Sequence, residues 1–563
     1  MIKDYIPITG WLPSYRKSYL GWDLIAGITL ASFVLPESMA YATLAGVPTY
    51  FGIYCCIAGG LLFALFTSSK HVAVGPTSSI SLMVGSTVAV LSKGDPARWA
   101  QIAELTALVV AGVCLMAFIF KLSSLVNFIS DSILLGFKAG AALSIMATQL
   151  PKLFGVEGGG KNFFSRIQIL IQHLPEAHWA VFIFGIIALA VLIAGDIFFK
   201  GKPISLLVVI AAILVISNTN LASQGIHITG KIPEGLPSLS RPSLRMRDVD
   251  GVLELAVACF LMGYIETISA ARTFAIKNNY EINPRQELLS LSAANIAAAF
   301  SSGYVVSGGL SQSTVNEKTG AKTPLSLIIC SATLAVILLY LTALLQNLPE
   351  VILAVIVLHA VSGLIKIKEL KRIWQLSKEE FGVAMIAVTG VLFLGILRGV
   401  LLSVILSLIL LIRRMTSPSV ALLGRIGKTS IFSDTARHPD NRIYPGMMIL
   451  RIESSILYFN AGNIMDKIQE RLRQATTETR LVIVDLSASN YVDVAGSKML
   501  VQLATYLREK NASLKIVDAL SSVREMLRKQ GMEEIIGHIS RKMSIDDFAS
   551  AFENEAQHGK EGA

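Results

Sequence analysis

The chain has 563 residues, of which 53% are hydrophobic and only 16% are charged. A soluble protein carries about 25% charged residues, so most of this chain is too apolar for a soluble enzyme. Its net charge of +10 is not gathered in a basic stripe with interleaved aromatic residues, which argues against a nucleic-acid partner. We assign this charge to loops that orient membrane helices.

The five cysteines all fall inside apolar runs and are not spaced with histidines as metal ligands are. They are Cys55, Cys56, Cys114, Cys259 and Cys330. We interpret them as small buried hydrophobic residues, and we expect no disulfide, no metal and no cofactor. The N-terminal stretch before the first apolar run lacks a small-residue cleavage site, so we expect no cleaved signal peptide.

About fourteen apolar segments, two of them short, follow one another between residues 22 and 415. A helix needs about 20 mostly apolar residues to cross a bilayer. We place the spans at residues 22–46, 50–67, 76–92, 101–120, 125–150, 179–199, 204–217, 253–275, 285–304, 310–320, 325–346, 350–365, 381–396 and 398–413. The sequence therefore predicts a polytopic α-helical membrane protein.

Basic residues test the number of spans, because cytoplasmic loops are enriched in lysine and arginine. If the N-terminus is cytoplasmic, each loop that follows an even-numbered span should be basic. These loops contain Lys70, Lys121, Lys200, Lys202, Arg272, Lys277, Arg285, Lys318, Lys322, Lys366, Lys368, Lys371, Arg372 and Lys378. Short odd-numbered loops contain almost none. We therefore predict a multi-pass protein of the inner membrane with both termini in the cytoplasm.

Two segments do not have the pattern of continuous membrane helices. The first, residues 68–91, begins with small, polar and β-branched residues and breaks at Gly75 and Pro76. A proline disfavours the helical conformation for the residue before it and suits the first turn of a helix. We therefore predict a half-helix that starts at Pro76 inside the membrane, with Thr77 and Ser78 at its tip.

The second segment, residues 300–324, runs through Ser307, Gly308 and Gly309 and should become helical near Ser311. The two segments are the third and tenth spans, which are seven apart. Fourteen spans divide into two sets of seven, and an odd number of spans reverses the orientation of the second set. Broken helices at matching positions of two inverted halves indicate a transporter binding site.

The N-terminus of a helix presents unpaired N–H groups and about half a positive charge. Two such ends that face each other would form a site for an anion. The hydroxyls of Thr77, Ser78, Ser311 and Ser313 are candidates for further donors. The alternative is that serine and glycine here only allow close packing of helices.

Two carboxylates also occupy matching positions, Glu37 in the first span and Glu266 in the eighth. Carboxylates deep in a bilayer are costly and are candidates for a functional role. Either could take up a proton together with the anion and so cancel charge. Pro36 breaks the helix beside Glu37 and frees backbone groups. The alternative is a carboxylate that pairs with a buried base, such as Lys138 in the fifth span, or that caps a broken helix.

Four other polar residues receive a structural interpretation. Asp23 and Arg398 lie near span ends, where we expect their side chains to extend to the membrane interface. We interpret His71 and His359 as satisfied helix-end histidines rather than proton sites.

From about residue 446 strands alternate with helices, which favours a small α/β domain. The strand-like runs GMMILRI, LVIVDL and ASLKIVDA are separated by helical stretches, one ending near residue 475 and one beginning near Ala495, and LSSVREMLRKQG follows them. We place the membrane part at residues 1–415, a linker at 416–437, the α/β domain at 438–555 and a tail at 556–563.

Four ordered motifs resemble those of the SulP (sulfate permease) family. PESMAYATLAGVPTYFGIY resembles the first signature of that family, and TSSKHVAVGPTSSISLM resembles its third-span motif. GYIETISAARTFA and SGGLSQSTVNEKTGAKTP resemble its eighth- and tenth-span motifs. The C-terminal part resembles the STAS domain that follows the membrane part in this family.

The resemblance implies a seven-plus-seven inverted repeat with a core and a gate, like that of uracil transporters, in a homodimer whose core shifts like an elevator. It implies anionic substrates such as sulfate, bicarbonate, chloride, oxalate or dicarboxylates. It also implies a site lined by Glu37, Tyr41, Pro76, Thr77, Glu266, Ser311 and Gln312.

The chain departs from the family pattern at three places. Many relatives have arginine in place of Gln312, and sodium-coupled bacterial members often have aspartate in place of Glu266; both departures favour proton coupling here. The STAS loop Asp493, Val494, Ala495 and Gly496 lacks the phosphorylatable serine of related domains. We therefore expect dimerisation and gating, rather than a phospho-switch, from this domain.

The leading hypothesis is a proton-coupled anion symporter, with sulfate as the default substrate. Sodium-coupled uptake of bicarbonate or a dicarboxylate is the alternative within the class. A membrane anion sensor that signals through its STAS domain to a cytoplasmic partner is an alternative of another class, and a passive anion channel is a further one. The membrane lipid and a small anion are the other expected partners.

Overall fold

The computed structural model describes residues 6–92, 95–124, 130–160, 162–199, 203–219, 221, 225–230, 232–242, 249–540 and 543–561. The chain forms two compact units, Met1–Ser407 and Leu408–Ala563. The predicted boundary at residue 415 lies in the same helix as this division, α20 (Ile396–Thr416). Each unit is considered separately.

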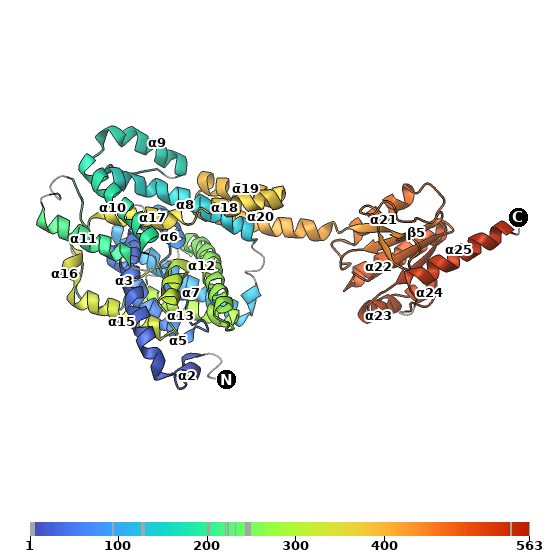
Figure 1. The fold of residues 1–563 in the computed structure, drawn as a ribbon, viewed down its shortest axis with the longest axis horizontal. Coiled ribbons are helices and arrows are strands. Elements are labelled where there is room, and N and C mark those ends of the chain that lie inside the picture. The colour runs from blue at the N-terminus through green and yellow to red at the C-terminus, as the bar shows by residue number, and fades with distance from the viewer. Residues whose placement is uncertain are drawn as a thin grey trace. The chain divides into compact units, whose positions relative to one another are not determined.

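Each of the fourteen predicted spans coincides with a helix of the structure (Figure 1). In chain order the helices are α3 (Leu20–Leu44), α4 and α5 (Thr49–Tyr54 and Gly60–Phe66), α6 (Ser78–Ser92), α7 (Pro96–Ile119), α8 (Asp131–Phe154), α10 (Trp179–Phe198), α11 (Ile204–Asn218), α12 (Val249–Lys277), α13 (Pro284–Phe300), α14 (Leu310–Lys318), α15 (Leu325–Tyr340), α17 (Glu350–Ser362), α19 (Lys378–Leu394) and α20. Residues 125–129 of the predicted fifth span and Lys200 and Lys202 of a predicted basic loop lie outside the described residues.

By length and composition, these helices fall into long ones that can cross a membrane and shorter apolar ones. Among the described residues, seven helical stretches are long and apolar enough to cross a membrane, and α6, α11 and α15 are shorter apolar helices. The second span is continuous from Thr49 to Phe66, because a π-helical turn, Cys55–Gly59, joins α4 to α5. Such turns are frequent at functional sites.

The helices pack in two groups. In one group α3 packs against α15, and α13 packs against α5 and α7. In the other group α8 packs against α17 and α19, and α10 packs against α11 and α17. The first group combines spans 1–4 with spans 8–11, and the second combines spans 5–7 with spans 12–14. We call these groups the core and the gate.

Among the described residues of the membrane unit, two further helices of ten or more residues were not predicted. They are α9 (Phe163–His173), which follows the fifth span, and α18 (Ile367–Leu376), which follows the twelfth span. Each has an apolar face and a polar face rather than an apolar surface all round, so neither has the composition of a membrane span. Their positions in the two sets of seven spans are equivalent.

The two broken segments meet as a short antiparallel strand pair inside the core. Strand β1 (Ala73–Gly75) precedes α6, and strand β2 (Ser307–Gly309) precedes α14. Ala73 lies opposite Gly309 and Gly75 lies opposite Ser307. Membrane-embedded backbone outside a helix needs internal hydrogen-bond partners, and the two strands supply these partners to each other. The predicted meeting of the two helix starts is therefore confirmed.

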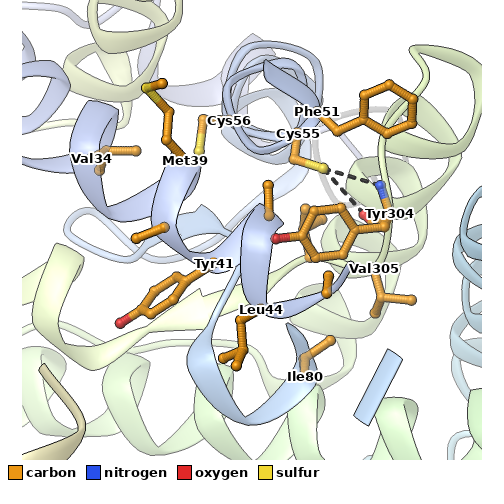
Figure 2. Packing of buried hydrophobic residues seen from close by; sticks show 14 of the residues in the cluster. Val34, Met39, Tyr41, Leu44, Phe51, Cys55, Cys56, Ile80, Tyr304 and Val305 are labelled. Atoms are coloured by element: carbon orange, nitrogen blue, oxygen red, sulfur yellow. Dashed lines mark hydrogen bonds between the residues drawn. The ribbon is translucent and has the colours of Figure 1, made fainter. Parts of the chain in front are cut away.

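Figure 2 shows Cys55 and Cys56 among the buried hydrophobic side chains of the core, with Cys55 beside Tyr304. Cys55 Sγ accepts a hydrogen bond from the backbone N–H of Tyr304 (3.1 Å) and its thiol lies 3.4 Å from the Tyr304 carbonyl oxygen. All five cysteines are buried and free. The interpretation of the cysteines as buried small residues is confirmed, and Cys55 also ties the second span to the segment before β2.

The second unit is an α/β domain with a five-stranded sheet in the order β4-β3-β5-β6-β7. Strands β5 (Met447–Ile452), β6 (Leu481–Asp485) and β7 (Ser513–Val517) are parallel, and β3 (Val420–Arg425) is antiparallel to β5 and to β4 (Phe432–Asp434). The helices are α21 (Ala461–Arg473), α22 (Val494–Glu509), α23 (Ser521–Lys529), α24 (Met532–Ile536) and α25 (Ile545–Glu561).

The segment at 416–437, predicted as a linker, instead contains β3 and β4. Val420, Ala421 and Leu423 of β3 are buried, so the strand contributes to the domain core. Helix α25 likewise continues through the predicted tail as far as Glu561. The strands are short and α25 is polar. The strands pair within the sheet of the domain and α25 packs on it, and the local sequence does not reveal these partners.

Candidate anion-binding site

The first half-helix begins inside the core. Helix α6 starts at Ser78, and the carbonyl of Thr77 accepts its first backbone hydrogen bond from Ser81 (2.9 Å). Thr77 therefore occupies the N-cap position, and Pro76 lies one residue before it. The prediction that the helix itself begins at Pro76 is wrong by two residues, because Pro76 instead joins the extended strand β1 to the cap.

The second half-helix begins opposite the first. Gly309 is the N-cap of α14 and has an extended conformation (φ −85°, ψ 130°), so the helix starts at Leu310. Gln312 stands in the first turn and is almost fully buried. Its Nε2 group donates to the carbonyl of Pro76 (3.2 Å) and to Glu37 Oε2 (3.2 Å). One side chain of the tenth span thus reaches both the third span and the first.

Glu37 is buried in the middle of α3, beside Pro36. Its Oε1 accepts a hydrogen bond from the Tyr41 hydroxyl one turn later (2.9 Å), and its Oε2 accepts from Gln312. Among the described residues no cation lies within 4 Å of this carboxylate. It is held by neutral donors alone.

Glu266 lies in α12 and accepts hydrogen bonds from three hydroxyls. Ser79 donates to Oε1 (3.1 Å), while Thr77 (3.1 Å) and Ser307 (3.2 Å) donate to Oε2. The carboxylate therefore sits at the N-terminal end of α6, where the helix dipole favours negative charge. Lys138 of the gate helix α8, the base that the sequence suggested as a partner, forms no ion pair within 4 Å with Glu266 in the described part of the chain.

The two carboxylates are arranged reciprocally. Glu37 belongs to the first set of seven spans and contacts the half-helix of the second set, α14. Glu266 belongs to the second set and contacts the half-helix of the first set, α6. Each half of the chain thus supplies a carboxylate to the helix start of the other half, as an inverted repeat requires.

Comparison with known proteins agrees with this architecture. The profile of the sulfate permease family matches residues 20–387, and that of the STAS domain matches residues 438–545. The first of these matches covers more than half of the chain. The chain belongs to the sulfate permease family.

Relatives in this family match nearly the whole chain. A "Probable sulfate transporter" of Mycobacterium tuberculosis is 28% identical over 96% of this chain and 98% of its own length. Sulfate transporter 4.1, chloroplastic, of Arabidopsis thaliana is 30% identical over 95% of this chain and 81% of its own length. The chain is thus an anion transporter of this family, and the family consists of transporters rather than enzymes.

Solved structures show the same fold at lower identity. Murine Solute Carrier 26 family member A9, in the inward-facing state, gives a TM-score of 0.89 at 20% identity, over 98% of this chain and 94% of that one. The transmembrane domain of the cyanobacterium bicarbonate transporter BicA gives 0.61 at 21% identity, over 70% of this chain and 98% of that one. The seven-plus-seven membrane fold with a C-terminal STAS domain is therefore shown.

Within this sulfate permease fold, the serines of the tenth span differ in what they contact. Ser313 is fully buried; its hydroxyl accepts from the Ala73 backbone N–H (2.9 Å) and donates to the Gly309 carbonyl (2.6 Å). Because both functions are used, Ser313 ties β1 to α14 and does not offer the free donor that we expected. Ser311 is exposed at the start of the same helix.

One atom of the site has no hydrogen-bond partner among the described residues, namely Oε1 of Gln312. It faces β1, since a Cβ placed on Gly75 would lie 3.1 Å from it. Ser78 is buried in the first turn of α6 beside Thr77. The structure thus gathers Glu37, Tyr41, Pro76, Thr77, Ser78, Glu266, Ser311 and Gln312 around the two helix starts.

Two buried carboxylates lie near the ends of helices and outside the predicted site. Glu287, in the first turn of α13, accepts hydrogen bonds from Thr67, Ser68 and Ser69. Asp23, which we expected to reach the interface, is fully buried and holds the loop before α15. The only sequence signal for Glu287 is an acidic residue in the first turn of a helix that begins with proline.

The two histidines are satisfied, as predicted. The imidazole of His71 lies within hydrogen-bond distance of the Tyr280 hydroxyl (3.2 Å) and of the Ala321 carbonyl (3.1 Å). His359 Nε2 lies 2.8 Å from Asp196 Oδ2, which joins α17 to α10.

Proposed function

We propose that the chain carries out proton-coupled uptake of a small anion, with sulfate as the first substrate to test. The supporting observation is the pair of half-helix starts that meet through β1 and β2, each with a carboxylate from the opposite half in contact with it. Helix N-termini attract an anion, whereas two ionised carboxylates repel it. A proton on one carboxylate removes that conflict.

Glu266 is the carboxylate that we assign to the coupling proton. It is partly exposed, whereas Glu37 is buried. The hydroxyls of Thr77 and Ser307 lie 3.3 Å apart, and either of them can be the donor. When Glu266 is ionised, both hydroxyls donate to it. When Glu266 is protonated, one hydroxyl can rotate and accept its O–H, so neither state leaves a buried polar group without a partner.

Gln312 takes the place that a fixed positive charge occupies in many relatives. As an amide it holds Glu37 and the Pro76 carbonyl without neutralising the carboxylate. Anion binding then depends on the helix ends and on the charge state of the two glutamates. We therefore expect affinity to increase as the pH falls.

Transport requires the site to face each side of the membrane in turn. We propose that the core, which carries both half-helices, moves against the gate in an elevator-like motion. We further propose that the protein is a homodimer in the cell inner membrane and that both of its termini lie in the cytoplasm. The packing of α3 with α15 and of α8 with α19 gives two groups of helices that can each move as a unit.

A second candidate is sodium-coupled uptake of bicarbonate or a dicarboxylate. It is favoured by the oxygen cluster of Glu266, Thr77 and Ser307, because hard cations prefer oxygen ligands. BicA, whose membrane domain has this fold, is titled a bicarbonate transporter.

The experiment that tests the proposal is uptake of labelled sulfate, bicarbonate and succinate into proteoliposomes under separate proton and sodium gradients. We expect an inward proton gradient to drive accumulation. Glu266→Gln should abolish that response yet retain anion counterflow, since the helix ends remain. Asp196→Asn, which alters an exposed gate carboxylate, is the matched control and should behave as the wild type.

Each other outcome contradicts a part of the proposal. Accumulation driven by sodium alone, and retained in Glu266→Gln, refutes proton coupling. Flux that no gradient concentrates indicates a channel. Anion binding without any flux indicates a sensor that acts through the STAS domain.

A further inference from the structure

Helix α18 has an apolar face that the rest of the protein covers only in part. None of its residues is buried. At about 100° per residue, Ile367, Leu370, Ile373 and Trp374 lie on one side of the helix. Ile367 is 70% exposed and Trp374 is 50% exposed, although α18 packs along α19. A short helix with exposed large apolar side chains beside membrane spans is typical of a helix that lies in the membrane interface.

The face of α18 next to this apolar face is strongly basic. Lys368, Lys371 and Arg372 occupy it, and Lys366 and Lys378 flank the helix. Glu369 is the one acidic residue of the helix, and it lies 3.8 Å from Arg372 in an exposed pair. Among the described residues, the four lysines form no ion pair within 4 Å.

Glu380, an acidic residue that follows α18, contacts α8 and the cap of its own helix. The Glu380 carboxylate accepts a hydrogen bond from the Ser132 hydroxyl at the start of α8 (2.8 Å), and the Glu380 backbone N–H donates to Ser377 Oγ (3.2 Å). The Lys378 ammonium lies 6.0 Å from the Trp374 ring centroid.

Helix α9 shows that the charge is not needed to hold such a helix in place. It occupies the equivalent position after the fifth span and is also amphipathic, with Phe164 and Ile171 exposed. Arg166 is its one arginine, and the helix contains no lysine. Because the repeat is inverted, α9 and α18 lie toward opposite sides of the membrane, and only α18 is basic.

We propose that α18 binds the headgroups of anionic phospholipids in the cytoplasmic leaflet, with its apolar face among the adjoining acyl chains. The inference rests on the orientation given under the proposed function. The cytoplasmic leaflet is the negatively charged one, and it attracts clusters of lysine and arginine next to membrane helices. The apolar side chains and the basic ones lie on adjacent faces of a single helix, which matches a lipid surface better than a soluble anion.

Trp374 gives a direct measurement, because its ring is half exposed on the proposed lipid face. The full-length protein is reconstituted with equal fractions of lipid that carries brominated acyl chains, either as phosphatidylglycerol or as phosphatidylcholine. The Trp374 signal is obtained as the difference between wild type and Trp374→Phe. We expect phosphatidylglycerol to quench Trp374 at least about threefold more strongly, and high salt to reduce the difference.

The variants separate charge from structure. The triple variant Lys368→Gln, Lys371→Gln, Arg372→Gln keeps the apolar face and should quench equally with both lipids. Arg166→Gln in α9 is the matched control and should keep the preference for phosphatidylglycerol. Equal quenching in the wild type, or a preference that survives in the triple variant, would overturn the proposal and favour a protein partner for this face.

This readout is independent of transport. Loss of proton coupling in the uptake experiment would leave the lipid preference unchanged. Loss of the lipid preference would leave the assignment of the anion site unchanged.

Discussion

Removal of the Asp23 carboxylate should destabilise the membrane unit far more than removal of an exposed carboxylate. One oxygen of Asp23 accepts the backbone N–H groups of Lys322 (2.7 Å) and Thr323 (3.1 Å). The other oxygen accepts the hydroxyls of Thr323 (2.7 Å) and Tyr15 (3.1 Å). The carboxylate therefore fastens the start of the first span to the loop that leads into α15.

The expected loss follows from these four bonds. A hydrogen bond to a charged group contributes about 1.5–3 kcal/mol. The bonds share one acceptor group, and water can reach part of the loop, so we take about 4 kcal/mol for Asp23→Ala, as for a broken buried charge interaction. An unfolding entropy of about 2.1 cal/mol/K per residue, over the unit Met1–Ser407, converts this loss to a fall in midpoint of about 5 °C.

The assay measures the thermal unfolding midpoint of the detergent-solubilised protein. The fraction of protein that remains monodisperse is recorded at each temperature, and the midpoint is the temperature at which half is lost. Asp23→Asn keeps one acceptor oxygen and should lower the midpoint by about half as much. Asp196→Ala removes an exposed carboxylate with one partner, His359, and should shift the midpoint by about 1 °C or less. The reasoning fails if Asp23→Ala unfolds at the wild-type temperature, or no earlier than Asp196→Ala.

Two further predictions concern the site and the STAS domain. A methyl group added by Gly75→Ala would lie 2.9 Å from Cys56 Sγ and 3.1 Å from Gln312 Oε1. Because such overpacking costs about 1–3 kcal/mol, the affinity for labelled sulfate should fall about tenfold in a binding assay. Unchanged affinity would contradict the placement of Gln312. Asp493 caps α22 through Gly496 N–H (2.8 Å) and also accepts the Tyr458 N–H (2.8 Å). Asp493→Ala should cost about 1–2 kcal/mol, seen as faster hydrogen exchange in the first turn of α22 in the intact protein; exchange at the wild-type rate would show that the cap contributes little.

Most of the membrane fold could be predicted because its determinants are local. Apolar runs mark the spans, and Gly75 with Pro76 marks the break before α6. The helices α9 and α18 escaped prediction because they are short and mix charged with apolar residues, so no run reaches the length of a span. Strands β3 and β4 were not predicted because the pairing of β3 with β5, and of β4 with β3, is a property of the folded sheet.

The site was predictable in its outline and not in its contacts. The matching positions of Glu37 and Glu266 follow from the repeat. That Gln312 would reach Glu37, and that Ser313 would use its hydroxyl on Ala73, depends on the approach of segments more than two hundred residues apart. Asp23 was assigned to the interface because its position near a span end is the only information that the sequence holds; its partners, Lys322 and Thr323, come from the other half of the chain.

The pairing of β1 with β2 has a consequence for how the protein is made. The extended backbone at residues 73–75 has its partner strand at 307–309, which leaves the ribosome much later. Until then those amide and carbonyl groups have only water or the insertion machinery to bond to, since lipid offers them nothing. The third span thus becomes stable in the bilayer only when the tenth arrives, so biogenesis of the transport unit is completed by its second half.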